Sequence, residues 1–172
     1  GLKENVHLNV SFVTFYDTIV EERLNIGSYS NYLAWRASLN YFKTFIQGDI
    51  QTNQLNENHV RQYRIFLLTT NNLRVKAKQK LSINTASSYY KHFIAVLKKA
   101  HKRNLLPTDL SEKAEYIKEE QTHREYLTEA ELGLLWKTEI KIEKVKHLAF
   151  FAALTGLRFS DIINLNWENI FN

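Results

Sequence analysis

Arg158 is the side chain best placed for chemistry, because it lies in a joint between two predicted helices within residues 155–167, TGLRFSDIINLNW. Residues 146–154 are almost wholly apolar, which predicts a helix buried on most sides. Gly156 supplies a residue at which that helix can end, and Ser160 is expected to cap the next one. The guanidinium of Arg158 then either caps the last carbonyls of the first helix or donates two parallel hydrogen bonds to an oxyanion.

The longer pattern of this joint resembles the first catalytic block of the tyrosine recombinases of the phage-integrase type. It consists of Thr-Gly-Leu-Arg, an acidic residue three positions on, and Leu-x-Trp. The resemblance implies that Arg158 clamps the scissile phosphate and that Asp161 helps to hold the arginine. It also implies an intact enzyme without metal or nucleotide cofactor, in which a tyrosine cuts and rejoins DNA through a 3′-phosphotyrosine intermediate.

The other catalytic groups of that family are missing from this sequence, so we expect the chain to be inactive by itself. The family uses a lysine on a β-hairpin, a His-x-x-Arg pair, a further histidine or tryptophan, and a tyrosine nucleophile. Only fourteen residues follow Arg158, none of them is tyrosine, and no His-x-x-Arg occurs in the chain. Methionine is absent even at position 1. We therefore expect a piece of a longer recombinase, from its N-terminal part.

The basic residues are concentrated in one part of the chain, which indicates a nucleic-acid partner. Net charge is only +5, yet no acidic residue occurs between Glu57 and Asp109. That interval holds eleven basic residues, while the other twelve Lys and Arg face all eighteen acids and leave the remainder at −6. Clustered charge of one sign is expected of a DNA-binding surface. The basic block is Arg61, Arg64, Arg74, Lys76, Lys78, Lys80, Lys91, Lys98, Lys99, Lys102 and Arg103.

Hydrophobic periodicity predicts helices, and a composition with one proline and five glycines argues against a turn-rich β fold. Ser30 is expected to cap the start of the second helix, and Gly48 to follow its end. Residues 71–81 are predicted to be a mobile basic loop that orders on DNA. The four expected helices span residues 10–24, 30–47, 56–70 and 82–104, and they form a small bundle.

This bundle also resembles the core-binding, SAM-like domain that precedes the catalytic domain in tyrosine recombinases. The last helix of that domain often opens with Ser-x-Asn-Thr, as residues 82–85 do here. In the family, the helices corresponding to residues 30–47 and 82–104 lie across the major groove of DNA. The side chains expected to contact DNA are Asn31, Arg36, Lys43, Lys76, Lys78, Lys80, Asn84, Thr85, Ser87, Ser88, Lys91 and His92.

The fold expected for the chain is all-α as present, in which a four-helix core-binding bundle precedes the helical beginning of a truncated, mixed α/β catalytic domain. The bundle is expected to span residues 1–107, and an acidic interdomain linker residues 108–126. The catalytic part is expected to span residues 127–172, and its first helix opens with a capping box formed by Thr128 and Glu131.

Composition excludes several other classes of protein. The chain has no cysteine, so disulfides and thiolate metal sites are excluded, and no His/Asp/Glu cluster has metal-ligand spacing. No apolar run approaches the roughly 20 residues of a membrane span, so we expect no membrane partner. The lack of cysteine fits a reducing setting, so we expect a cytoplasmic protein. No cofactor is expected.

The expected partners are double-stranded DNA and, for the intact protein, other recombinase subunits in a tetramer. We expect the chain alone to be monomeric and its parent to be an integrase of a mobile element. Two alternatives stay open at this level. One is a non-catalytic helical DNA-binding accessory protein, and the other is a protein-interaction domain whose basic face meets an acidic partner.

Overall fold

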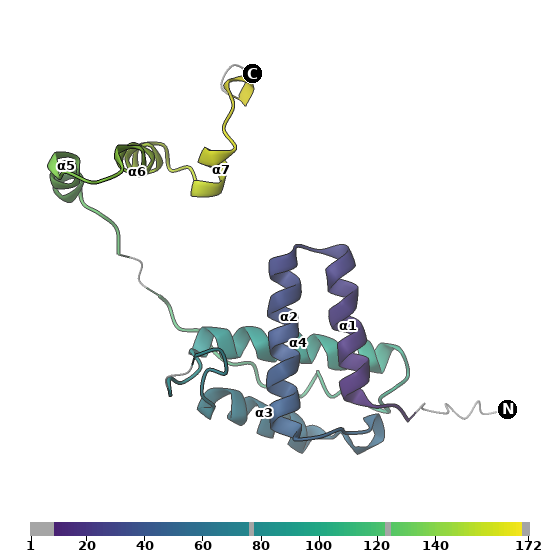
Figure 1. Cartoon of the computed structure of the whole chain (residues 1–172). Coiled ribbons are helices and arrows are strands. Elements are labelled where there is room, and N and C mark those ends of the chain that lie inside the picture. The colour runs from purple at the N-terminus through teal and green to yellow at the C-terminus, as the bar shows by residue number, and fades with distance from the viewer. Residues whose placement is uncertain (1–8, 76–77, 123–124, 170–172) are drawn as a thin grey trace. The chain divides into compact units, whose positions relative to one another are not determined.

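The computed structural model describes residues 9–75, 78–122 and 125–169, and it divides into two compact units after Gln121. Over the described residues the regular structure is helical, with two isolated antiparallel bridges and no strands, which confirms the predicted all-α class. The first unit contains α1 (Phe12–Ile26), α2 (Tyr29–Ile46), the 3₁₀ turn η1 (Thr52–Gln54), α3 (Glu57–Thr69) and α4 (Ile83–Lys102) (Figure 1).

The four long helices begin where the sequence supplies a polar cap. Ser11 Oγ accepts a hydrogen bond from the Thr14 N–H at 3.0 Å, and Asn56 Oδ1 accepts one from the Asn58 N–H at 3.0 Å. Such caps satisfy amides that have no partner inside the helix, which fixes where each helix starts. Ser28 and Ser82 cap α2 and α4 in the same way.

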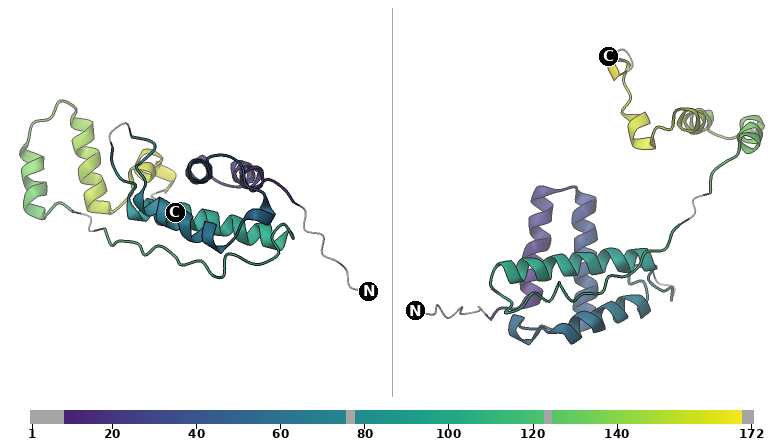
Figure 2. Two further views of the ribbon diagram at one scale, coloured as in Figure 1. Left: turned by 90° about the horizontal axis from the view of Figure 1, so that it is seen from below. Right: turned by 180° about the vertical axis from the view of Figure 1, so that it is seen from behind.

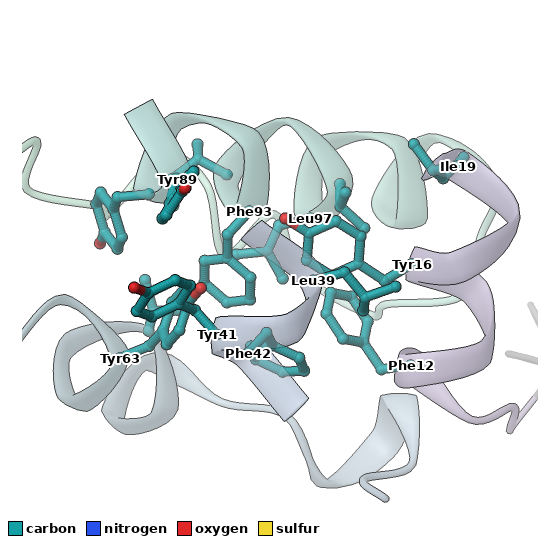
Figure 3. Close-up of a cluster of buried hydrophobic side chains, with 14 of the residues drawn as sticks. Phe12, Tyr16, Ile19, Leu39, Tyr41, Phe42, Tyr63, Tyr89, Phe93 and Leu97 are labelled. Atoms are coloured by element: carbon teal, nitrogen blue, oxygen red, sulfur yellow. The ribbon is translucent and has the colours of Figure 1, made fainter. Parts of the chain in front are cut away.

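The helices of the first unit meet around an aromatic core (Figure 3). Phe42 of α2 lies at its centre, with ring centroids 5.4 Å from Phe12 of α1, 5.3 Å from Tyr63 of α3 and 5.2 Å from Phe93 of α4. All four rings are fully buried. Burial of large aromatic surfaces therefore holds the four helices together.

A buried polar cluster joins the same four helices. Ser38 Oγ of α2 donates to the Tyr89 carbonyl of α4 at 2.8 Å and lies 2.8 Å from the Tyr16 hydroxyl of α1. The Tyr63 hydroxyl of α3 donates to the Ser38 carbonyl at 3.3 Å. Burial raises the pKa of Tyr16 and Tyr63 well above the usual value for tyrosine, so both hydroxyls stay neutral donors. These bonds fix how α4 crosses α1 and α2.

Two predicted caps of α2 are one or two residues away from the observed ones. Ser28, not Ser30, is the N-cap, because its Oγ accepts the Asn31 N–H at 3.3 Å. At the other end Gln47, not Gly48, takes the left-handed conformation, with φ 53°. The helix therefore ends on a non-glycine residue, for which the left-handed backbone conformation is sterically unfavourable.

The segment predicted to be a linker instead packs on the bundle for most of its length. Residues 109–121, which we call the acidic strap, begin with a turn at residues 110–113 and then run back along α4 without regular secondary structure, as seen from behind in Figure 2. Leu110 and Ile117 are each only 5% exposed and belong to the core of the first unit. Apolar anchors spaced along an otherwise charged segment explain why it packs there rather than remaining solvated.

The described part of the second unit contains the helices α5 (Glu129–Lys137), α6 (Glu143–Thr155) and α7 (Phe159–Ile163), and the 3₁₀ turn η2 (Trp167–Asn169). The predicted capping box of α5 is present: Thr128 Oγ1 accepts the Glu131 N–H at 3.3 Å, and the Glu131 carboxylate accepts the Thr128 N–H at 2.8 Å. The prediction of this helix start is confirmed.

Two predictions about the joint after α6 are wrong. No residue of α6 is buried, because only α5 and α7 contribute packing to it in this unit, and Leu154 is 81% exposed. Trp136 packs edge-to-face on Phe150 with ring centroids 4.8 Å apart, but this covers only one side of α6. Arg158, not Ser160, occupies the N-cap position of α7, because its carbonyl accepts the Ile162 N–H at 3.0 Å.

Candidate nucleic-acid interface

The basic loop between α3 and α4 is closed at its base by backbone hydrogen bonds. Asn71 and Lys80 form an isolated antiparallel bridge, and the Asn72 N–H donates to the Gln79 carbonyl at 2.7 Å. Lys78 and Lys80 are exposed, whereas the predicted contact Lys76 lies outside the described residues. The loop therefore holds at least two cations at a defined place beside the start of α4.

Tyr41 of α2 contacts the first half of the same loop. The Leu73 N–H donates to the Tyr41 hydroxyl at 2.8 Å, and Asn72 Oδ1 accepts the Arg74 N–H at 3.0 Å. Arg74 is exposed and its positive charge acts on Tyr89 of α4, where it opposes the rise in pKa that burial causes. The loop thus presents Arg74 next to α4.

Several predicted residues come together in a groove between α2 and α4, with a volume of about 510 Å³. Three of the expected contacts, Asn84, Thr85 and Ser88, lie in its α4 wall. Ser30 and Arg74 are not among the site residues predicted from the sequence, although Arg74 begins the alternating basic row that continues at Lys78 and Lys80. The groove is lined by Ser30, Leu33, Ala34, Arg74, Asn84, Thr85, Ser88 and Tyr89.

The three residues predicted on α2 are not equivalent in the structure. Asn31 is exposed one residue after Ser30 of the groove. Arg36 is engaged inside the first unit, because its Nη1 lies 2.6 Å from Asp17 Oδ1 and 3.0 Å from Glu21 Oε1 on α1. Lys43 is exposed, but it follows Ala34 by nine residues, or about 13 Å along the helix. Of the three, Asn31 is nearest in sequence to the groove.

Three side chains that were predicted to contact DNA instead contact the acidic strap: Asn84, Ser87 and Lys91. Asn84 Nδ2 donates to the Glu120 carbonyl at 3.0 Å, and Asn84 Oδ1 accepts the Glu120 N–H at 2.8 Å. Ser87 is 1% exposed and its Oγ donates to the Ile117 carbonyl at 3.1 Å. Lys91 Nζ lies 2.6 Å from Glu119 Oε1. In this conformation the three side chains bind the protein's own chain.

The Lys91 contact has an electrostatic consequence for its partner. The hydrogen bond from Lys91, together with that from Ser87, holds the pKa of the Glu119 carboxyl below its usual range. Glu119 is therefore ionised at neutral pH, and its charge opposes that of Lys91 at the surface of α4.

His92 lies in an aromatic stack rather than on the open surface. Its ring is stacked on Trp35 of α2 with centroids 4.4 Å apart, and the Arg23 guanidinium lies 4.4 Å from the same indole. Burial, followed by the charge of Arg23, lowers the pKa of His92 to about 4. His92 is therefore neutral at pH 7 and contributes no positive charge to the interface.

The cations of the basic block differ in whether they already have an acidic partner. Lys99 and Arg103 both pair with Glu22 of α1, at 2.9 Å each, and Lys91 pairs with Glu119. Arg64 lies 3.8 Å from Glu115 of the strap. Among the described residues, the members of the block without an ion pair are Arg61, Arg74, Lys78, Lys80, Lys98 and Lys102.

Arg158 and Asp161 lie in the second unit, at the start of α7. Both are exposed, and over the described residues the Arg158 guanidinium makes neither a hydrogen bond nor an ion pair. It does not cap the carbonyls that end α6. The Asp161 carboxylate accepts from Ser160 Oγ at 3.3 Å and forms no ion pair with Arg158 in the described part of the chain.

Comparison with models of protein families matches residues 11–129 of this chain to the phage integrase SAM-like domain. The chain belongs to this family. The match confirms the resemblance predicted from the first four helices, and the matched residues contain α1 to α4, the acidic strap and the first residue of α5. Arg158 lies after the matched residues. No curated protein and no solved structure matches the chain.

The described residues contain neither a membrane-spanning helix nor a metal-binding cluster. No helix there is both long and apolar enough to span a membrane. In the same residues no three His, Cys, Asp or Glu side chains gather where they would hold a metal ion.

Proposed function

We propose that the SAM-like domain of this chain binds double-stranded DNA through the groove between α2 and α4 and the basic loop beside it. The observation that carries the proposal is that cations without an acidic partner lie in a loop beside a groove whose α4 wall carries the polar side chains of Asn84, Thr85 and Ser88. Arg74, Lys78 and Lys80 have no acidic partner among the described residues. Family membership supports the same conclusion.

The proposed contacts divide into two kinds. Arg74, Lys78 and Lys80 neutralise backbone phosphates and release counterions, which supplies affinity without regard to sequence. Thr85 and Ser88, on the first turns of α4, donate to phosphates or base edges, as hydroxyl groups do in DNA complexes. The helix start itself favours an anion, because its first amides point outward along the helix axis.

We further propose that the intact protein is a tyrosine site-specific recombinase, an integrase of a mobile element, acting as a tetramer on DNA. The support is the family match of the SAM-like domain and the pattern around Arg158. Arg158 would bind the scissile phosphate with two hydrogen bonds as charge builds on its oxygens, and Asp161 would hold the arginine. This chain supplies no tyrosine after Arg158.

The recombinase proposal predicts a strong effect of Arg158→Lys in the full-length protein. Lysine keeps the charge but lacks the planar fork of donors, so strand cleavage should fall by about a hundredfold or more. Cleavage of a suicide DNA substrate, followed as covalent protein–DNA product, measures this effect. Cleavage at the wild-type rate would contradict the role of Arg158.

The DNA-binding proposal is tested by titrating duplex DNA at several salt concentrations with two matched double variants. Lys78→Ala/Lys80→Ala removes two exposed cations of the basic loop, and Lys98→Ala/Lys102→Ala removes two exposed cations near the C-terminal end of α4. Two lost phosphate contacts reduce the slope of log affinity against log salt by about 1.8. We expect that reduction for the first variant and little change for the second.

Three results would contradict this assignment. Absence of duplex binding at low salt would remove the function itself and point to an acidic protein partner. Equal slopes for the two double variants would place the DNA elsewhere on the basic block. A larger effect of Lys98→Ala/Lys102→Ala would move the interface to the other end of α4.

A further inference from the structure

We propose that the acidic strap (residues 109–121) is an internal competitor for DNA, whose last residues leave α4 when the duplex binds. The proposal rests on the proposed function and goes beyond it. It states that DNA binding requires the protein to break contacts of its own, and it identifies those contacts.

The strap occupies a continuous polar row on α4. Asn84, Ser87 and Lys91 are three and four residues apart, so they lie on one face of the helix. Each of them binds the strap: Asn84 holds both backbone groups of Glu120, Ser87 donates to the Ile117 carbonyl and to Glu119, and Lys91 pairs with Glu119. The row is thus filled by the carboxylate and the carbonyls of the strap.

The chemistry of the strap at this row resembles that of the proposed ligand. A carboxylate and a phosphate both offer anionic oxygens to an ammonium or a hydroxyl group. The strap carries five acids and two lysines, a net charge of −3, and it lies beside the basic block. Asn84 also lines the groove proposed for DNA, so the end of the strap and the duplex would meet at one side chain.

The strap is attached in two ways, and only one of them is suited to release. Leu110 and Ile117 are buried, and exposing them would cost apolar burial. Residues 118–121 are all exposed and are held to α4 through the polar contacts of Glu119 and Glu120. An exposed ion pair contributes little net free energy, because water competes for both charges. Release therefore begins after Ile117.

The test compares two variants that remove the same charge from the strap. Glu119→Gln weakens the contact with Lys91, whereas Glu112→Gln changes an exposed carboxylate that makes no ion pair among the described residues. The whole chain is titrated with a mixed-sequence DNA duplex at low salt. We expect Glu119→Gln to bind about two- to fivefold more tightly than Glu112→Gln, the range that corresponds to one exposed ion pair.

Amide hydrogen exchange of the wild-type chain, with and without the duplex, gives a second measurement. The Glu120 N–H donates to Asn84 in the free protein, so we expect DNA to accelerate its exchange while the core amides of α4 stay protected.

Each outcome supports or overturns a defined part of the proposal. Equal affinities of the two variants would mean that only overall charge matters, and a protected Glu120 N–H in the complex would mean that the strap stays in place. Either result overturns the competitor and leaves DNA binding intact. Failure of all variants to bind the duplex overturns DNA binding, and the competitor with it.

Discussion

Replacement of Ser38 by alanine should destabilise the first unit far more than the loss of an exposed hydroxyl group does. The Ser38 hydroxyl is fully buried, donates to the Tyr89 carbonyl at 2.8 Å and lies 2.8 Å from the Tyr16 hydroxyl. Ser38→Ala removes both contacts and leaves the Tyr16 hydroxyl buried without this partner. An orphaned buried hydroxyl costs about 1–3 kcal/mol and the second lost bond about 1 kcal/mol, so we expect about 2–4 kcal/mol in total.

The same reasoning predicts that a second substitution partly rescues the first. Tyr16→Phe alone leaves Ser38 bonded to Tyr89 and should cost about 0.5–1.5 kcal/mol. In Tyr16→Phe/Ser38→Ala the orphaned hydroxyl is gone, so the double variant should be about 1–2 kcal/mol more stable than the sum of the single losses predicts. Ser30→Ala, the same change at an exposed site of α2, should stay within about 0.5 kcal/mol of wild type.

Urea denaturation followed by circular dichroism measures the free energies of unfolding of these variants. Additive losses, within about 0.5 kcal/mol, would refute the idea that the Tyr16 hydroxyl depends on Ser38. A loss below about 1 kcal/mol for Ser38→Ala would refute the assigned cost of the buried cluster.

Two further predictions concern stability. His92 is partly buried, and its pKa of about 4 lies below the roughly 6.5 of an unfolded chain, so the unfolded state gains the proton first. Stability should therefore be full above pH of about 6.5 and fall on acidification to about 4, by at most about 1.4 kcal/mol per pH unit, and His92→Gln should flatten this slope in pH-dependent urea unfolding. Gln47→Gly should raise the unfolding free energy by about 1 kcal/mol, because glycine takes φ 53° without strain, whereas Gly48→Ala should not destabilise. An unchanged urea midpoint for Gln47→Gly would contradict this account of the C-cap.

The helices of the first unit were predictable because the local sequence and the core packing favour the same structure. The apolar stripe of α2 returns at helical spacing, and its members Trp35, Leu39 and Phe42 are indeed buried. Capping boxes are equally local, so Thr128 and Glu131 were recognisable without tertiary information. The end of α2 was misplaced by one residue, because glycine is only the commonest, and not the necessary, residue at a left-handed position.

The partners of polar side chains on α4 were not predictable from helix periodicity. The pattern shows that Asn84, Ser87 and Lys91 lie away from the aromatic core, but it does not distinguish an open surface from one that another segment covers. The covering segment has a loose, charged sequence whose buried apolar residues, Leu110 and Ile117, lie seven positions apart. Its packing depends on contacts between residues about thirty positions apart, such as Ser87 with Ile117, and such contacts leave no local signal.

In the second unit the prediction from sequence was wrong in the opposite sense, because α6 was predicted to be buried and none of its residues is buried. Composition alone predicted that α6 is buried, since apolar residues occur on nearly every side of it. The residues that would cover those sides are not among its neighbours in this unit, and Phe151 and Leu154 remain exposed. The apolar residues of a helix set the largest surface that it is able to bury, and the elements packed against the helix determine how much of that surface is buried.

The two hydrogen bonds between Asn84 and Glu120 also set the length of a tether. Eight residues, 121–128, lie between Glu120 and the first residue of α5, and a chain of that length reaches at most about 28 Å. Release of the strap as far as Ile117 extends the tether to eleven residues and its reach to about 38 Å. The effective concentration of one unit near the other falls with tether length to about the −3/2 power, here by about 1.6-fold. A protein that opens this contact on DNA thus exchanges a small loss of local concentration for about 10 Å of additional reach.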